Sequence, residues 1–252
     1  MTANPAGVDT GSDPRVTGEY IHQLSDRSGT LTLVGVVHDH PASTYRVRQA
    51  VAGIDPDVLA LELPPISVPL FEEYGRTERS PPTFGGEMSA AIQAAAPGVA
   101  VGIDRPTGGF FRRLGRVLLR DRPPVGTVQD LVSTAVSTTG HAVLCRVAAG
   151  VAARTSIRVE VDSPVGHGVD HADRPEKQAL DEREQVRRSR SFIEAFQSAG
   201  RFRASRLEDT VREAEMASRL TELRERGEVV AVVGIVHLEP LIERLDAAGP
   251  AA

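Results

Sequence analysis

The sequence predicts an α/β fold with a central, mostly parallel sheet. In it an early and a late strand are neighbours, and the helical middle of the chain packs as a cap or side layer. Short apolar runs rich in β-branched residues occur in the first part of the chain and again near residue 230. Helical segments separate them, and the first two runs are joined by residues 43–54. A strand, a helix and a strand in this order form a right-handed unit with parallel strands.

Four apolar runs are expected to be the strands of this sheet. Residues 30–38 and 57–63 come first, and a shorter run at 99–103 follows. Residues 228–236, Glu-Val-Val-Ala-Val-Val-Gly-Ile-Val, are the clearest strand in the chain. These runs are mostly apolar and rich in β-branched residues, which is typical of strands that are buried on both faces.

The remaining periodic segments predict helices. Ser43 is a suitable N-cap for the first of them, and Gly227 ends the one before the late strand. The long stretch in the middle carries little charge, so it is expected to be largely buried or paired with another helix, with a break near Gly140. Residues 66–86 are expected to be loop with some helix. The expected helices cover residues 43–54, 87–96, 125–155, 175–199, 205–226 and 238–245.

Composition and charge exclude several classes of protein. The net charge of −5 does not favour a nucleic-acid partner. Cys145 is the only cysteine, which excludes an intrachain disulfide and a zinc ribbon. The sequence has neither a signal-peptide pattern nor an apolar run long enough to span a membrane, so a soluble, cytoplasmic protein is expected. Residues 1–14 are expected to be a flexible tail, and residues 15–252 a single domain.

One short motif occurs twice. Residues 34–38 read Val-Gly-Val-Val-His and residues 233–237 read Val-Gly-Ile-Val-His, each at the end of an apolar run. Ligands of open α/β sheets bind beyond the carboxyl ends of the strands. If the two strands are parallel neighbours, His38 and His237 therefore meet at one edge of the sheet.

Carboxylates occur at equivalent places on the other two strands. Glu62 ends the second strand and Asp104 follows the third. Two imidazoles with one or two carboxylates are a donor set for Zn²⁺, Mn²⁺ or Co²⁺, and such an ion makes bound water nucleophilic. Without a metal, a histidine and a glutamate can act as base and orienting group. Structural roles stay open, with Glu62 as a cap and Asp104 as the partner of Arg105.

Most of the other reactive side chains are expected to be structural. His40 lies two residues after His38 and is expected to be exposed to solvent, although a role as third ligand stays open. His167 and His171 lie in a segment whose glycine and proline disfavour a helix, so they are not expected to be ligands. Cys145 lies in an apolar helical segment with no base beside it, which favours a buried, inert thiol.

These motifs together resemble the TraB/PrgY/Tiki family. That family opens with a strand and Gly-x-x-His, continues through a helix to a strand ending in Glu-Leu, and closes with Gly-x-x-His before a last helix. The resemblance spans about residues 31–245. The matching pieces here are Gly35-Val-Val-His38, Asp55-Pro-Asp57, Glu62-Leu63, Ile103-Asp104-Arg105, Arg212-Glu-Ala-Glu-Met216-Ala217 and Gly234-Ile-Val-His237-Leu238.

The resemblance implies a fold related to the erythromycin-esterase and ChaN-like proteins, and a metal-dependent hydrolase that acts on a peptide or a small-molecule acyl substrate. His38, Glu62 and His237 would then carry the metal or base roles, with Mn, Co or Zn as the ion. Arginines of the pocket would serve a substrate carboxylate or an oxyanion, and a homo-oligomer stays open. The residues that the resemblance assigns to supporting the pocket are Asp104, Arg105 and Arg212.

Two other functions use the same residues. One is a hydrolase without a metal, in which His38 is the base and Glu62 orients it; it would resist chelators and have a bell-shaped pH profile. The other is a protein that binds or sequesters peptides without turning them over. The first hypothesis, a metal-assisted hydrolase, is the one that the sequence favours.

Overall fold

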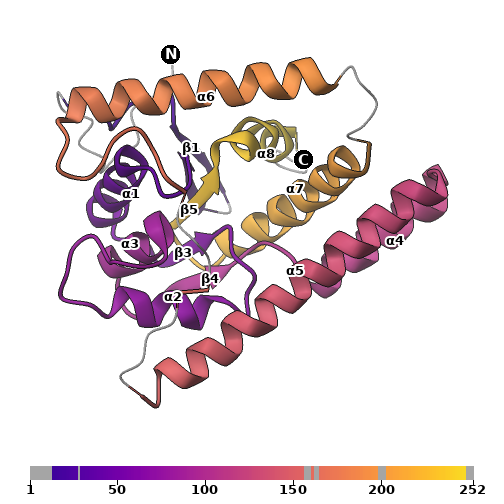
Figure 1. The fold of residues 1–252 in the computed structure, drawn as a ribbon, viewed down its shortest axis with the longest axis horizontal. Helices are drawn as coiled ribbons and strands as arrows, with labels where there is room; N and C mark the ends of the chain where they lie inside the picture. Colours follow the sequence, from indigo (N-terminus) through magenta and orange to yellow (C-terminus); the bar gives the residue numbers. More distant parts are fainter. Residues whose placement is uncertain (1–12, 28, 156–159, 162–164, 198–202, 248–252) are drawn as a thin grey trace.

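The computed structural model describes residues 13–27, 29–155, 160–161, 165–197 and 203–247. The predicted tail at residues 1–14 lies almost wholly outside these ranges. The α/β class is confirmed, since a mixed, mostly parallel sheet lies between layers of helices (Figure 1).

The sheet has five strands in the order β1-β2-β5-β3-β4. They are β1 (Ile21–Asp26), β2 (Gly29–Val36), β3 (Val58–Leu61), β4 (Ala100–Gly102) and β5 (Val229–Gly234). All neighbours are parallel except β1, which pairs antiparallel with β2 along one edge. The late strand β5 is therefore central, with the early strand β2 beside it, as the sequence predicts.

The register of β2 and β5 places the two copies of the repeated motif side by side, shifted by one residue. Gly35 pairs with Val233, and Val36 pairs with Gly234. The two glycines are offset by one residue, so they play different parts. A Cβ on Gly35 would lie 2.8 Å from side-chain atoms of Ile235 and Leu238, so this glycine lets the following helix pack closely on the sheet.

Eight helices are described, and they cover both faces of the sheet. One face packs on α1 and α3, through a cluster that includes Val47, Val51 and Met88. The other face packs on α7 and α8, through a cluster that includes Leu220 and Leu241. The bounds are α1 (Pro41–Ile54), α2 (Val68–Gly75), α3 (Gly86–Ala94), α4 (Gly108–Asp121), α5 (Val125–Ala152), α6 (Pro175–Gln197), α7 (Arg203–Arg224) and α8 (Ile235–Ala247).

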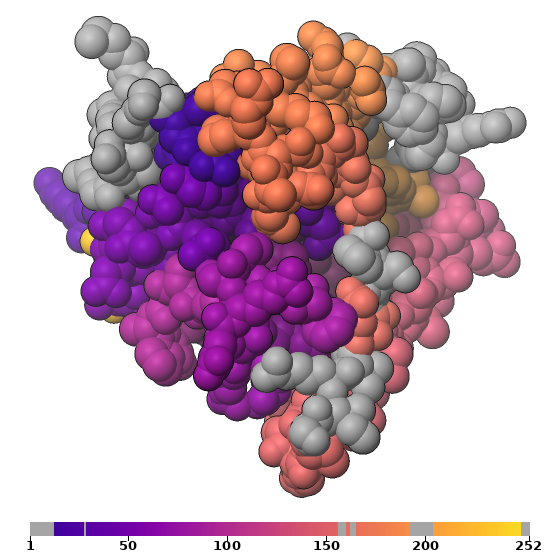
Figure 2. Space-filling view, turned by 60° about the vertical axis from the view of Figure 1, so that its left-hand side comes forward, coloured from indigo at the N-terminus to yellow at the C-terminus, as the bar shows by residue number. Residues whose placement is uncertain are grey.

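The helical middle of the chain divides between three positions. Helix α7 lies directly on the sheet, whereas α4 and α5 form an outer layer that contacts α7 and α2 (Figure 1). Helix α6 lies on α1, and the space-filling view shows it seated on the N-terminal part of the chain (Figure 2). The predicted cap or side layer therefore consists of α4, α5 and α6, and α7 belongs to the core.

Helix α5 differs from its prediction in one respect. It runs unbroken through Gly140, because an isolated glycine inside a long helix weakens it without ending it. Of the two expectations drawn from its low charge, burial or pairing with another helix, the second holds, because α5 contacts α2 and α7. Its inner face packs through Leu131, Cys145 and neighbouring alanines, but valines such as Val136 and Val147 are more than half exposed.

Two elements have no counterpart among the predicted ones. Strand β1 was missed because four of the six residues in its sequence, Ile-His-Gln-Leu-Ser-Asp, are polar, as suits an edge strand. Helix α4 was missed because its arginines hide a short apolar stripe that includes Phe110 and Leu114. Thr107 caps it by accepting a hydrogen bond from the Phe110 amide.

Two predicted helix starts shift in ways that matter for the site. Helix α1 begins at Pro41, and its N-cap is His40, whose ring Nδ1 accepts a hydrogen bond from the Ala42 amide, instead of Ser43. The predicted exposure of His40 is therefore wrong, because its ring is fully buried in this capping position. Helix α8 begins at Ile235, so His237 lies in the first turn of a helix.

Candidate functional site

The carboxyl edge of the parallel strands brings the predicted polar side chains together. His38 follows β2, Glu62 follows β3 and Asp104 follows β4, while His237 lies in the first turn after β5. These four strands are consecutive in the sheet, so four segments far apart in sequence converge at one edge.

Gly234 marks the point of convergence. A Cβ built on this glycine would lie 3.3 Å from Glu62 Oε2, 3.5 Å from His38 Nε2 and 3.9 Å from His237 Cδ2. The missing side chain therefore leaves a small space that three functional groups share. Its backbone amide donates a hydrogen bond of 2.6 Å to Glu62 Oε2, which holds that carboxylate against the strand end.

Arg212 of α7 ties two of the carboxylates together. Its Nε and Nη2 donate to both oxygens of Asp104, at 3.0 and 2.7 Å, and Nη2 also donates to Glu62 Oε1 at 2.9 Å. These largely buried contacts raise the pKa of Arg212 despite its desolvation, which acts in the opposite direction. The guanidinium is thus a permanent positive charge that satisfies two buried carboxylates.

His237 is held by a second acidic residue. Its Nδ1 lies 3.1 Å from Glu213 Oε1, while its Nε2 lies 3.3 Å from Arg212 Nη1 and 3.5 Å from Glu62 Oε1. Burial lowers the pKa of His237, but the hydrogen bond with Glu213 and the charge of Glu62 outweigh it, so the pKa is raised.

Arg105 lies at the edge of this group. The alternative in which Asp104 pairs with Arg105 is not what the structure has, because Asp104 pairs with Arg212 and Arg105 pairs with Glu208 of α7. Burial is the main cause that lowers the pKa of Arg105, and the neighbouring charge of Arg212 adds to it.

The closest partner of His38 is Glu87, at the start of α3. His38 Nδ1 lies 2.7 Å from Glu87 Oε1, and the carboxylate is almost fully buried, whereas 55% of the His38 side chain is exposed. The hydrogen bond with Glu87 raises the pKa of His38 to about 9. Burial alone would raise the pKa of Glu87, but the contact with His38 lowers it. The two form a charged pair, and His38 Nε2, which has no hydrogen-bond partner among the described residues, lies at the space next to Gly234.

The residue after His38 holds this pair in place. Asp39 adopts a left-handed backbone conformation with φ of 58°, which Asp tolerates better than most residues. Its amide donates a hydrogen bond to Glu87 Oε2 at 2.8 Å, and its Oδ2 accepts one from the Val165 amide at 2.9 Å. Non-glycine residues in this conformation cost energy and are common at functional sites.

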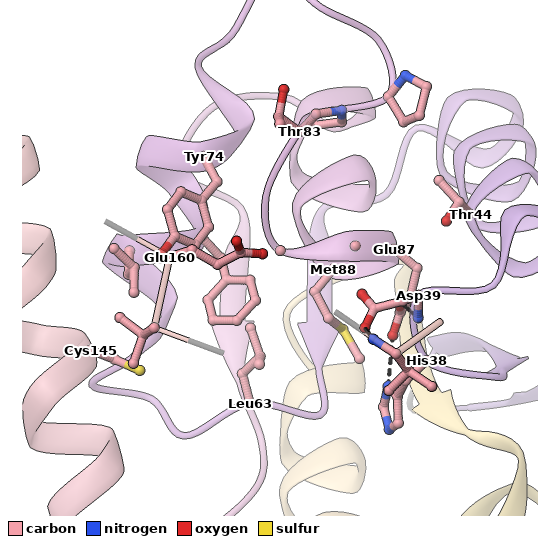
Figure 3. Close-up of a pocket in the computed structure, with 18 of the residues that line it drawn as sticks. His38, Asp39, Thr44, Leu63, Tyr74, Thr83, Glu87, Met88, Cys145 and Glu160 are labelled. Carbon is pink, nitrogen blue, oxygen red and sulfur yellow. Dashed lines mark hydrogen bonds and ion pairs between the residues drawn. The ribbon is translucent and has the colours of Figure 1, made fainter. Parts of the chain in front are cut away.

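A cavity of about 420 Å³ opens from His38 and Glu62 toward α2 and α5. In the close-up, the His38–Glu87 pair lies on one side, Tyr74 and Cys145 lie on the other, and Leu63 lies between them (Figure 3). Arg105 and Arg212 are not among its lining residues. A cavity of this volume is at the small end of the range for ligand sites.

The structure allows a test of the ligand set that the resemblance implies, His38, Glu62 and His237. The Arg212 guanidinium donates to Glu62 Oε1 and lies 3.3 Å from His237 Nε2. Glu62 Oε1 and His237 Nε2, the two atoms that would bind an ion, thus both face the positively charged Arg212 guanidinium. In this arrangement a divalent ion shared by these three side chains does not fit, and their role as ligands stays a prediction.

A different cluster lies beside them. His40, His167 and Asp181 place one ligand atom each within 4.8 Å of one another, which is close enough to hold a metal ion, and nothing identifies one. All three side chains already have partners. His40 Nδ1 caps α1, His40 Nε2 lies 3.2 Å from Asp181 Oδ2, and His167 Nε2 lies 2.8 Å from the His38 carbonyl oxygen. Burial lowers the pKa of His40, which favours the neutral ring.

Cys145 is buried, as predicted, and it lines the cavity. The expectation that no base lies beside it is wrong, because His141 on the preceding turn of α5 places its Nε2 3.5 Å from the sulfur. Residues four apart on a helix lie on the same face, so this contact was readable from the sequence.

Sequence reasoning missed Glu87, Glu213 and His167. Glu87 follows Gly85-Gly86 at the start of a helix, which is a common position for an acidic residue and gives no hint of His38, 49 residues away. Glu213 is adjacent to the predicted Arg212, and its contact with His237 depends on how α7 packs against α8. Only tertiary structure brings these groups together.

Among the residues that the structure describes, no helix combines the length and the apolar character needed to cross a bilayer. No family model, curated protein or solved structure matches this chain.

Proposed function

We propose that the protein is a hydrolase of a peptide or other acyl bond, and that His38 and Glu87 move the proton in the reaction. One observation carries the proposal: the short contact between a half-exposed imidazole and a buried carboxylate at the mouth of a cavity. A carboxylate on Nδ1 fixes the tautomer and leaves Nε2 free to exchange a proton with water or a leaving group.

The chemistry follows from the two ring nitrogens. In its neutral form His38 takes a proton at Nε2 from a water molecule that attacks the carbonyl carbon. The imidazolium, stabilised by Glu87, then gives the proton to the leaving oxygen or nitrogen as the acyl bond breaks. The raised pKa of His38 means that the base form grows as the pH rises toward about 9.

Glu62 is the second group at this end of the cavity. Glu62 was expected to orient His38, but it is Glu87 that contacts His38 Nδ1, so the proposal gives the orienting role to Glu87. Glu62 instead accepts hydrogen bonds from Gly234 and Arg212, so it is a fixed negative charge close to the space that His38 Nε2 faces. Arg212, Asp104 and His237 support the proposal as the group that holds Glu62 in position.

The metal-assisted version remains a second candidate because the cluster of His40, His167 and Asp181 is close enough to hold an ion next to the His38 backbone. An ion there would fix the turn that carries His38. In the metal-assisted version a chelator would remove this ion and lower turnover. In the version without a metal the chelator would have no effect, so the two versions differ in their response to it.

The test is hydrolysis of a panel of p-nitrophenyl esters and a fluorogenic peptide library, with and without a chelator and with metal analysis of the purified protein. We expect turnover that resists the chelator and falls about 100-fold or more in His38→Ala and in Glu87→Gln. Controls are His22→Ala on β1 and Glu176→Gln at the exposed start of α6. Wild-type protein with no turnover, or His38→Ala with full turnover, would overturn the proposal.

A further inference from the structure

The cavity next to His38 has two chemically different ends. Its far end is formed by mostly apolar side chains of two helices: Leu70, Phe71 and Tyr74 of α2, and Cys145 of α5. Phe71 and Tyr74 meet edge to face, with ring centroids 5.8 Å apart, and Tyr74 also contacts Phe84. This is an aromatic wall within a partly enclosed space, which is the kind of surface that binds an apolar group.

The charged lining is acidic. Four carboxylates line the cavity among the described residues, and no arginine or lysine does: they are Asp39, Glu62, Glu87 and Glu160. The charges of Glu87 and Glu62 are balanced by His38 and Arg212. Among the residues that the structure describes, Asp39 and Glu160 form no ion pair with an arginine or lysine, so the described part of the lining has an excess of carboxylates.

These two observations define a substrate class. We infer that the far end of the cavity binds a neutral aromatic or aliphatic group of the substrate, and that the acidic lining rejects substrates with a carboxylate at this position. The inference rests on the proposed function only in taking the group to belong to a substrate. The binding preference itself is a property of the cavity walls.

The inference assigns specificity to particular residues. Phe71 and Tyr74 form the wall against which the apolar group packs, and Glu160 repels an anion. In the close-up the Glu160 carboxylate lies beside Tyr74, on the side of the cavity away from His38 (Figure 3). The arginines that the resemblance made available for a substrate carboxylate lie outside the cavity lining.

The test uses ligands that cannot be hydrolysed, so that binding is measured apart from turnover. Isothermal titration calorimetry compares 4-phenylbutan-2-one, which is neutral and aromatic, with 3-phenylpropanoate, which has the same phenyl arm and a negative charge. Butan-2-one lacks the ring. We expect the phenyl ketone to bind at least tenfold more tightly than the carboxylate and about 30-fold or more tightly than butan-2-one.

Two variants with matched controls locate the site. Phe71→Ala should weaken binding of the phenyl ketone about tenfold, whereas Phe111→Ala, on the exposed side of α4, should leave it unchanged. Glu160→Gln should strengthen binding of 3-phenylpropanoate about threefold or more, and Glu225→Gln should not. Glu160 and Glu225 are both exposed, so this second pair keeps the test valid if Phe71→Ala does not fold.

The outcomes separate the two proposals. Tight binding of the phenyl ketone without turnover of any ester or peptide would support the inference and remove the hydrolase. Turnover that shows no preference for aromatic acyl groups would support the hydrolase and remove the inference about the apolar group. Tighter binding of 3-phenylpropanoate than of the ketone, or equal effects of Phe71→Ala and Phe111→Ala, would overturn the inference.

Discussion

At the scale of single residues, the site depends on which carboxylate meets which cation. Glu87 is almost completely buried, and its only charged partner among the described residues is His38, whose side chain is half exposed. Glu62 is equally buried but faces Arg212, which never loses its charge. The closest partner of Glu87 is therefore a group that titrates, whereas the closest partner of Glu62 is one that does not.

This coupling predicts how stability depends on pH. The pKa of His38 is about 9 in the folded protein and near 6.5 in an unfolded chain, so the folded state holds the proton more tightly. The stabilisation is complete below about pH 6.5 and is lost as the pH rises through 9. We expect the free energy of unfolding in urea to fall between pH 6.5 and 9.5, by an amount that solvent screening of the exposed ring reduces.

The control for this prediction is Glu87→Gln, which removes the cause of the raised pKa. Its free energy of unfolding should change less with pH over the same interval, and NMR should show the His38 ring titrating closer to 6.5. An unchanged titration in the variant would mean that Glu87 does not set the pKa of His38.

The space at Gly234 gives a second prediction at this scale. In Gly234→Ala the new methyl group lies 3.3 Å from Glu62 Oε2 and 3.5 Å from His38 Nε2, so the neighbours must give way by only a few tenths of an ångström. We expect a folded protein whose turnover falls about 100-fold, because the methyl group occupies the space that His38 and Glu62 share. Steady-state kinetics and thermal unfolding measure the two effects.

The matched substitution is Gly140→Ala on α5, where a Cβ meets no atom within 4 Å. It should raise stability by about 0.5–1 kcal/mol, as expected for replacing glycine inside a helix, and leave turnover unchanged. Equal turnover in both alanine variants would show that the space at Gly234 is not needed.

At the scale of elements, α6 is attached to the site through a buried ion pair. Glu182 of α6 pairs with Arg46 of α1, and both side chains are at most 2% exposed. Arg46 also donates to the carbonyl oxygen of Gly35, at 2.8 Å. Ser43 donates to Glu182 and accepts a hydrogen bond from the Val37 amide, the residue before His38. Helix α6 thus supports the turn that leaves β2.

Glu182→Gln tests this attachment. The change leaves the Arg46 charge buried without its partner, so we expect a loss of about 3–5 kcal/mol in the free energy of unfolding. The control is Glu184→Gln, two residues away on the same helix, which removes the exposed pair with Arg188 and should cost at most about 1 kcal/mol. Similar losses in urea unfolding for both variants would contradict the structural role of Glu182.

The same scale explains which elements the sequence could predict. Strands buried on both faces, such as β5, are continuous apolar runs and were found within one or two residues of their ends. His40 was misplaced because an extended chain would point it the same way as the exposed His38. The chain instead turns at Asp39, and the turn puts His40 at the cap of α1, beneath α6. A single left-handed residue thus reverses a side-chain orientation that alternation alone predicts.

At the scale of the whole molecule, the α/β class and the pairing of β2 with β5 followed from short-range patterns. The repeated Gly-x-x-His motif brought His38 and His237 to the same edge of the sheet, and the structure has both there. The acidic partners could not be predicted. Glu87 and Glu213 reach the histidines from helices whose docking depends on packing across the two faces of the sheet. Function therefore stays a proposal tied to a geometry, because hydrogen-bond partners decide what each imidazole can do.

The central place of β5 has a consequence for the way the chain acquires its structure. The strands on one side of it, β1 and β2, and those on the other, β3 and β4, pair among themselves but meet only through β5. Between residue 102 and residue 229 the described part of the chain forms four helices, α4 to α7. A ribosome-bound chain in which β5 has not yet been synthesised therefore leaves the edges of β2 and β3 without the strand that they both pair with. Non-local pairing of this kind slows folding in general, so we expect the sheet of this chain to form late, after β5 has been synthesised.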